Sequence, residues 1–357
     1  MKIIQVIPFF GMGGAEIMCE NLVYELRKLG HEVVVISLYN KKTPITERLE
    51  KSGADIRYLD KKEGLDFSVF GKLKKIFKQE KPDVVHTHIY VSKYVFPIAS
   101  EMKIKVVHTV HSVAKHESSK ISRVVNKYFF NHTNTIPVAL SNKVQDTLIA
   151  EYKLEKSKVP VVLNGIDLSK CNAKTCYEYK DRFKIIHIGS FTDVKNHSGL
   201  IESFGIFNRK YPNTELHLIG DGINRIKIEK LVESKSLSKK IIFHGLQSNV
   251  HQYLSQMDVF ALPSLYEGVP MSIAEAMGTG LPIVATAVGG VPDMLDQSCA
   301  QLVPVDVLAI ANAFENYYLD YNLRKAHGGK ALEMSKRFSA AVMADKYIKI
   351  YQREVLR

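Results

Sequence analysis

Long hydrophobic runs, cysteine pairs and low-complexity segments are missing from this sequence of 357 residues. No apolar run approaches the roughly 20 residues that a membrane-spanning helix needs. The apolar start, residues 1–10, is short, contains Pro8 and leads into a glycine-rich turn, so we interpret it as a strand and not as a signal peptide. Four cysteines without metal-ligand spacing form no disulfide framework. These absences favour a reducing, cytosolic setting.

The composition is that of a globular protein, with 46% hydrophobic and 24% charged residues. A chain of this length is long enough for two domains of ordinary size. The net charge of +12 indicates an anionic partner. Nucleotide sugars, anionic lipid surfaces and nucleic acid all qualify on charge alone. Nucleic acid is disfavoured, because the sequence has no recognisable recognition module and no dense aromatic and basic stripe.

Short apolar segments rich in β-formers alternate with helix-period segments along the whole chain. Strands are expected near residues 3–7, 32–38, 55–59, 83–88, 105–110, 136–140 and 159–163, and again near 184–188, 215–219, 241–244, 258–262 and 282–285. Strands that alternate with helices predict parallel sheets covered on both faces. A polar run near residues 168–182 interrupts the pattern and is the expected domain boundary.

The segment 258–293 carries two acidic residues in a setting suited to chemistry. A buried strand is followed by a loop with Glu267 and by a helix with Glu275, which begins near Pro270 and ends by Gly280. A bend at Gly268 would bring both carboxylates to the mouth of one cleft. The free N–H groups of the first helical turn and the positive end of its dipole form a site for phosphate.

This segment resembles the donor-site signature of glycosyltransferase family 4, in which two Glu separated by seven residues precede a Gly-Gly-Val-Pro turn, here residues 289–292. The resemblance covers nearly the whole chain. It implies an α/β fold of the GT-B type, with two Rossmann-like parallel-sheet domains facing an interdomain cleft. Residues 1–170 would form the acceptor-side domain and residues 183–335 the nucleotide-sugar-binding domain. Residues 336–357 would form a final helix that packs back on the first domain.

The resemblance also implies roles for individual residues. Glu267 would face the transferred sugar and the leaving phosphate, His111 would lie beside the reacting carbon, and Lys195 would neutralise the diphosphate. Glu275 would bind the ribose hydroxyls. The implied catalytic residues are thus Glu267, His111 and Lys195, and the implied donor-binding residues are Gly13, Gly14, Ser190, Lys195, Gly245, Leu246, Glu267, Gly268, Val269, Pro270, Met271 and Glu275.

Several patterns keep a second interpretation. The glycine turn at residues 11–16 departs from the dinucleotide fingerprint, because Glu16 stands where a third glycine belongs, and it is otherwise a tight turn that needs positive φ. His86 and His88 share a strand face, yet no further ligands accompany them, so no metal is expected. Ser190 stands where family members usually have Arg, which places more of the charge compensation on Lys195.

The implied activity is transfer of a hexosyl group, with retention and without a metal or other cofactor. The donor would be a nucleotide diphosphate sugar, with UDP favoured as the nucleotide. The acceptor would be a saccharide or lipid-linked saccharide in cell-surface polysaccharide assembly. The basic segments 70–81 and 120–130 suit peripheral contact with an anionic membrane, although such helices also simply pack on a sheet. The expected location is cytoplasmic, with the inner face of the membrane as an alternative. The rivals are a GT-B epimerase or phosphorylase and a noncatalytic sugar-nucleotide binder.

Overall fold

The computed structural model describes residues 1–11, 13–112, 114, 120–179 and 181–353. Met12 of the predicted glycine turn, Lys180 of the predicted boundary and the end of the predicted final helix, residues 354–357, lie outside the described residues. The chain divides into two compact units. The first contains residues 1–165 together with the segment that starts at Ala340, and the second is Ile166–Ser339.

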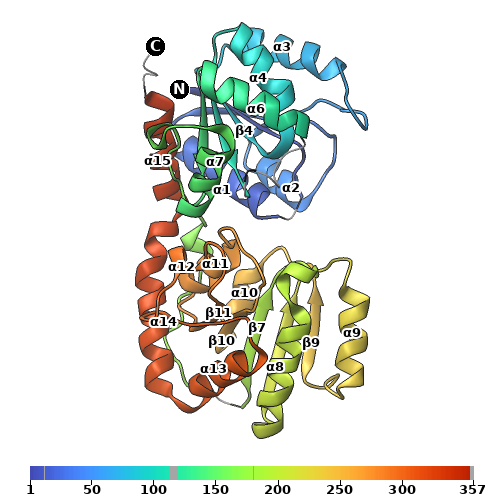
Figure 1. Ribbon diagram of the computed structural model, residues 1–357, viewed down its shortest axis with the longest axis vertical. Coiled ribbons are helices and arrows are strands. Elements are labelled where there is room, and N and C mark those ends of the chain that lie inside the picture. The colour runs from blue at the N-terminus through green and yellow to red at the C-terminus, as the bar shows by residue number, and fades with distance from the viewer. Residues whose placement is uncertain (12, 113, 115–119, 180, 354–357) are drawn as a thin grey trace. The chain divides into compact units, whose positions relative to one another are not determined.

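The first unit is a six-stranded sheet covered by helices (Figure 1). Its strands are β1 Lys2–Ile7, β2 Glu32–Ser37, β3 Asp55–Tyr58, β4 Val84–His88, β5 Lys105–Val110 and β6 Thr135–Ala139. Its helices are α1 Gly14–Lys28, α2 Pro44–Lys51, α3 Ser68–Glu80, α4 Ser92–Glu101, α6 Lys120–His132, α7 Asn142–Tyr152 and α15 Ala340–Gln352, with short 3-10 segments at Ile89–Val91 and Lys156–Lys158. All strand pairs are parallel, in the order β3-β2-β1-β4-β5-β6. The central strands are buried because helices cover both faces.

The second unit repeats this architecture. Its strands are β7 Phe183–Ile188, β8 Thr214–Ile219, β9 Ile241–Gly245, β10 Val259–Leu262, β11 Ile283–Thr286 and β12 Ala300–Val303. Its helices are α8 His197–Lys210, α9 Arg225–Ser234, α10 Val250–Leu254, α11 Met271–Gly278, α12 Val291–Met294, α13 Val307–Leu319 and α14 Tyr321–Ser335, with 3-10 segments at Leu168–Lys170, Asp193–Lys195 and Lys336–Phe338. The parallel sheet has the order β12-β11-β10-β7-β8-β9. Each unit has an apolar core of its own.

Both sheets have the doubly wound Rossmann order, which confirms the predicted α/β class. Strand order reverses between β1 and β4 in the first sheet and between β7 and β10 in the second. Open α/β sheets bind ligands beyond the carboxyl ends of the strands at such a reversal. The loops that follow β7 and β10 are therefore the first place to look for a site in the second unit.

One predicted strand is wrong, and one observed strand was not predicted. Residues 159–163 make only a single bridge, Val161 to Ala139, because Pro160 has no N–H for a ladder. Strand β12 was not predicted, because it has only four residues and three of them are only partly buried. Helix α11 begins at Met271, with Pro270 as its N-cap at an extended ψ of 117°, which agrees with the predicted start near Pro270.

Candidate functional site

Lys195 and Glu267 form an ion pair at the strand-order reversal of the second sheet. Lys195 ends the turn after β7, and Glu267 lies in the loop after β10. The Nζ of Lys195 is 2.6 Å from Oε1 of Glu267, and the hydroxyl of Ser264 donates to the same oxygen at 2.6 Å. Glu267 and Ser264 are buried, while Lys195 keeps 20% of its side chain exposed. The carboxylate is thus held by two donors at the place where the fold favours a ligand.

The loop that carries Glu267 is held on both sides by neighbouring backbone. The hydroxyl of Thr286 donates to the carbonyl of Ser264 at 2.6 Å, and the amide of Leu265 donates to the carbonyl of Val194 at 2.8 Å. The amide of Gly290 donates to the carbonyl of Glu267 at 3.1 Å. Ser264 was missed by the sequence analysis. Its spacing of three residues before Glu267 is the signal that could have marked it.

Glu275 lies in α11 and is buried with only 8% of its surface exposed. Burial raises the pKa of its carboxyl group to about 7. Within the described part of the chain its carboxylate has no hydrogen-bonding partner, which leaves both oxygens available to a ligand. Burial, together with the neighbouring Glu275, raises the pKa of the Cys171 thiol to about 12. The thiol is therefore neutral beside the carboxyl group.

The predicted residues between the two acids surround the start of α11. Gly268 and Val269 are half-buried, while Pro270 and Met271 are buried. The first-turn N–H groups of any helix lie outside its internal hydrogen bonds and attract anions. The structure therefore brings Lys195 and Glu267 together and places Glu275 on the helix that follows the same loop.

The loops after β8 and β9 lie beside the loop after β7. Gly220 has φ of +135°, and a Cβ there would be 2.0 Å from the carbonyl oxygen of Gly189. The amide of Gly220 donates to the carbonyl of Gly245 at 2.9 Å. Ser190 is exposed, and Leu246 exposes 64% of its surface. These close approaches keep the predicted donor-binding residues of the three loops at one edge of the sheet.

Arg225 is a second residue that the sequence analysis missed. Its guanidinium lies 5.8 Å from the centre of the Phe243 ring and forms ion pairs with Asp221 and Glu229. A Cβ on Gly245 would lie 3.5 Å from its Nη1. The side chain therefore brings a permanent positive charge to the carboxyl end of β9. The Gly-Asp-Gly turn at residues 220–222, which ends three residues before Arg225, is the sequence signal that could have marked it.

In the first unit, Gly13 and Gly14 are exposed at the start of α1. Gly13 has φ of −91° and Gly14 is helical, so the interpretation as a turn that needs positive φ is wrong. A Cβ on Gly13 would lie 2.6 Å from a carboxylate oxygen of Glu16. Burial raises the pKa of Glu16, against an opposing hydrogen bond from the amide of Gly11. The missing Cβ therefore makes room for Glu16 to fold back on the loop.

His111 follows β5 and contacts His88, with Nε2 of His111 3.3 Å from Nδ1 of His88. Burial lowers the pKa of His111 to about 3, so the ring is neutral at physiological pH. Both ring nitrogens of His86 are hydrogen bonded, to Tyr351 and to Thr109. They are therefore not free to bind a metal ion, and the described residues contain no cluster of three or more metal-ligating side chains.

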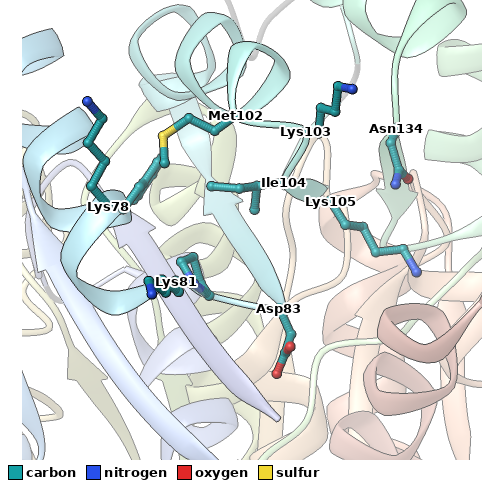
Figure 2. Close-up of a pocket in the computed structure, with 10 residues that line it drawn as sticks. Lys78, Lys81, Asp83, Met102, Lys103, Ile104, Lys105 and Asn134 are labelled. Carbon is teal, nitrogen blue, oxygen red and sulfur yellow. The ribbon is translucent and has the colours of Figure 1, made fainter.

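A separate hollow of about 610 Å³ lies at the amino ends of β4 and β5 (Figure 2), whereas His111 follows the carboxyl end of β5. Its lining includes Lys78, Lys103, Lys105 and Asp83. The ammonium groups of the three lysines point in different directions in Figure 2, and Lys105 donates to the carbonyl of Tyr351 at 2.7 Å. Asp83 accepts from the amide of Lys2. This hollow has no converging set of charges, and we assign no ligand to it.

The order and direction of the twelve strands define a GT-B fold, and solved structures agree. The Anabaena protein HepE in complex with UDP matches with a TM-score of 0.82 at 17% identity, over 98% of this chain and 99% of that chain. Sucrose-phosphate synthase from Thermosynechococcus elongatus matches with a TM-score of 0.80 at 18% identity, over 99% and 98%. Identities this low show the fold alone.

The sequence families agree with the fold. Residues 12–170 match the model of Glycosyltransferase Family 4, and residues 175–334 match the model of Glycosyl transferases group 1. Together the two models span most of the sequence, and the chain belongs to glycosyltransferase family 4.

Several relatives have curated names that describe glycosyltransferases. An uncharacterised glycosyltransferase of Methanocaldococcus jannaschii is 28% identical over 60% of this chain and 58% of the relative. An Escherichia coli UDP-Gal:alpha-D-GlcNAc-diphosphoundecaprenol alpha-1,3-galactosyltransferase is 30% identical over 61% of each. The matched region thus spans less than two thirds of either protein. An N-acetyl-alpha-D-glucosaminyl L-malate synthase of Bacillus anthracis is 24% identical over 97% of this chain and 95% of the relative.

Proposed function

We propose that this protein is a retaining hexosyltransferase that uses a nucleotide diphosphate sugar, with UDP as the favoured nucleotide. The acceptor is a saccharide or a lipid-linked saccharide in the assembly of a cell-surface polysaccharide. The observation that carries the proposal is the buried Glu267 held by Lys195 at the strand-order reversal of the second sheet. The names of the relatives support the chemistry, since one moves galactose from UDP-Gal to a diphosphoundecaprenol-linked sugar.

In this proposal the second domain, residues 183–335, binds the donor. Glu275 accepts hydrogen bonds from the ribose hydroxyls, because its buried carboxylate has no partner in the described chain. The amides at the start of α11 and Lys195 stabilise the charge that develops on the leaving diphosphate. The backbone near Gly245 and Leu246 contacts the base, and Glu267 faces the transferred sugar.

Lys195 changes its main partner during this reaction. In the free protein its ammonium group is bonded to Glu267, and the arriving diphosphate offers a second anion to the same group. Ser264 then keeps its hydrogen bond to Oε1 of Glu267. The carboxylate is therefore held in place whether or not Lys195 is shared. The exposed Ser190 leaves this charge compensation to Lys195 and the helix amides.

The first domain, residues 1–170, is proposed to hold the acceptor side, with Gly13, Gly14 and His111 contributing to the site. The closing helix within residues 336–357 is proposed to belong to this domain. Tyr347 of α15 supports that assignment, since its hydroxyl is 2.7 Å from Oγ1 of Thr109 in β5. Metal and cofactor play no part in the proposed reaction.

A donor panel tests the proposal. Release of nucleoside diphosphate is measured for UDP-, GDP- and ADP-linked hexoses with and without a saccharide acceptor. Transfer predicts release that depends on the acceptor, isomerisation of the donor without release indicates an epimerase, and binding without turnover indicates a noncatalytic binder. Glu267→Ala should lower the rate more than the donor affinity, and Glu275→Ala should weaken binding. If neither substitution changes either quantity, the site assignment is wrong.

Peripheral contact with an anionic membrane is also part of the proposal. The apolar side of α3, including Leu73 and Phe77, is buried, so that helix packs on the core. Phe67 before α3 exposes 74% of its surface, and Val124 and Tyr128 of α6 expose 71% and 58%. Apolar side chains beside basic ones suit a lipid surface. None of the helices in the described chain is long and apolar enough to cross a membrane.

Partition of the purified protein onto liposomes tests this contact. Binding to vesicles that contain anionic lipid should exceed binding to neutral vesicles. Replacing Lys75, Lys78 and Lys127 by Gln should remove the difference, because each lysine near an anionic surface contributes about 1 kcal/mol. Unchanged partition after this replacement would exclude the contact.

A further inference from the structure

A chain of buried polar side chains joins the C-terminal helix to β4 and β5 in the first unit. The hydroxyl of Tyr351 is 2.7 Å from Nδ1 of His86, and Nε2 of His86 is 2.7 Å from Oγ1 of Thr109. Thr109 also contacts the hydroxyl of Tyr347 at 2.7 Å. His86 and Thr109 are fully buried. Polar groups buried in this way are tightly constrained, because leaving one unpaired is costly.

Gln5 extends this chain toward His88. Its side-chain nitrogen is 3.5 Å from the hydroxyl of Tyr351, and its Oε1 is 2.8 Å from Nε2 of His88. A carboxamide oxygen only accepts hydrogen bonds, so Nε2 of His88 carries the proton. Complete burial lowers the pKa of His88 well below its ordinary value, so the ring is neutral. A neutral ring has one N–H, and Nδ1 of His88 is therefore an acceptor.

The state of His88 determines the state of His111. The two rings meet through Nδ1 of His88 and Nε2 of His111, 3.3 Å apart. Because the first atom is an acceptor, the proton lies on the second. His111 is neutral as well, so its Nδ1 has a lone pair and no hydrogen. That atom is buried and has no hydrogen-bond partner among the residues that the structure describes. The group that would satisfy it is a hydrogen-bond donor such as a hydroxyl, and not an anion.

We propose that Gln5 is a positioning residue that sets the tautomer of His111 through His88, so that Nδ1 of His111 accepts a hydrogen bond from a sugar hydroxyl. Only the identity of that hydroxyl rests on the proposed function. The tautomer is a property of the protein alone and can be measured without a substrate. Gln5 acts through His88 and does not itself contact the sugar.

Nitrogen-15 NMR of protein labelled at histidine measures the tautomer directly. The His111 signals are assigned by their loss in His111→Gln. At neutral pH we expect protonated Nε2 and bare Nδ1, in a ratio of about tenfold or more, because the opposite form would place two lone pairs against each other. A proton on Nδ1, or a doubly protonated ring, would overturn the proposal.

Gln5→Met tests the cause of this preference. Methionine matches the length of glutamine but lacks its oxygen acceptor, so nothing then holds the proton of His88 on Nε2, and His111 loses its preference for a proton on Nε2 as well. The control is Tyr347→Phe, which removes a hydroxyl from the far end of the chain and leaves Gln5 and His88 unchanged. We expect the tautomer ratio of His111 to fall toward unity in Gln5→Met and to persist in the control. Equal ratios in both variants would refute the role of Gln5. If Gln5→Met does not fold, the spectrum of the unmodified protein still decides the tautomer.

Kinetics test whether the acceptor is used. With UDP-glucose and UDP-galactose as probes, Gln5→Met should lower kcat for UDP release about twofold with little change in the donor KM, since only about half of the molecules then have a bare Nδ1 that accepts from the reacting sugar. Tyr347→Phe should leave both quantities as they are in the unmodified protein. A changed tautomer ratio with an unchanged kcat would overturn the use of Nδ1. No release by the unmodified protein from any donor would instead refute the proposed function and leave the NMR result standing.

Discussion

Gly289 lies directly against the backbone of Glu267. Its φ is +58°, and a Cβ at this position would be 1.8 Å from the carbonyl oxygen of Glu267. The next residue, Gly290, donates its amide to the same oxygen. The Gly-Gly turn after β11 is therefore the support on which the Glu267 loop rests, and its glycine is required for both space and backbone angle.

The first prediction concerns this support. Gly289→Ala should shift the Glu267 loop and lower the transfer rate at least about 100-fold, since a displacement of about 1 Å in a catalytic group costs that much. It should also lower the free energy of unfolding by about 2 kcal/mol, because alanine is strained at this φ. Steady-state kinetics and thermal unfolding measure the two effects.

Gly329→Ala is the matched control for that substitution. Gly329 lies in α14 and is exposed, and a methyl group added to it would meet no atom within 4 Å beyond its two chain neighbours and the backbone of its own helix. The substitution should stabilise the protein by about 0.5–1 kcal/mol, since alanine is the better helix former. Equal behaviour of the two variants would show that Gly289 does not support the loop.

The second prediction concerns Ser264. Ser264→Ala removes one of the two donors to Oε1 of Glu267. We expect kcat to fall about tenfold with little change in the donor KM, because the lost hydrogen bond orients Glu267, which we propose faces the transferred sugar. Ser234→Ala, at an exposed serine in α9, should change neither quantity. An increase in KM alone would assign Ser264 to donor binding instead.

The third prediction is a dependence of stability on pH. Burial raises the pKa of Glu275 from its ordinary value of 4.5 to about 7. Between these values the folded protein binds a proton that the unfolded chain has released, so stability falls as pH rises from about 4.5 to about 7. Glu275→Gln has no carboxyl group to ionise, so its stability does not fall in this way. At pH 8 it should be more stable than the unmodified protein by up to about 3 kcal/mol.

Denaturant unfolding at pH 5 and pH 8 measures this difference. The gap between the unmodified protein and Glu275→Gln should be larger at pH 8. Glu333→Gln is a surface control, because Glu333 is exposed and pairs only with Lys330 within the described chain. A gap independent of pH would mean that the carboxyl of Glu275 is not desolvated in solution.

The fourth prediction uses the departure of this sequence from its family. Ser190 is exposed in the loop after β7, five residues before Lys195. If charge on the leaving diphosphate limits the rate, Ser190→Arg should raise kcat/KM about tenfold, because a bidentate guanidinium adds to the single ammonium of Lys195. Ser190→Gln, which adds a long side chain without charge, should not. An unchanged or lower kcat/KM in Ser190→Arg would show that Lys195 and the helix amides suffice.

Periodicity was sufficient to predict the sheet strands that are fully buried. β10, Val259–Leu262, lies within the predicted segment 258–262 and is buried throughout, since a strand covered on both faces needs continuous apolar sequence. β12 escaped detection because only one of its four residues is fully buried. Residues 159–163 are apolar enough to be predicted as a strand and yet form only one bridge, since Pro160 lacks the N–H that a ladder requires.

The proximity of site residues was harder to predict. Lys195 and Glu267 are close because β7 and β10 are neighbours in the sheet. Local sequence patterns do not predict the order of strands in a sheet. The tie from Gln5 to His88 crosses 83 positions of sequence. Polar residues inside strands, such as Gln5 and Thr109, carry no periodic signal that separates a network from an isolated buried group.

The second unit is one uninterrupted stretch of chain whose two ends meet. The amide of Ile166 donates to the carbonyl of Phe338 at 2.8 Å, and Ile166 bridges to Ser339. The piece from 166 to 339 can therefore be excised or exchanged between relatives as a single cassette. The other half has no such simple form, since cutting the chain at 165 would discard α15 and remove the hydroxyls of Tyr347 and Tyr351 from the buried Thr109 and His86.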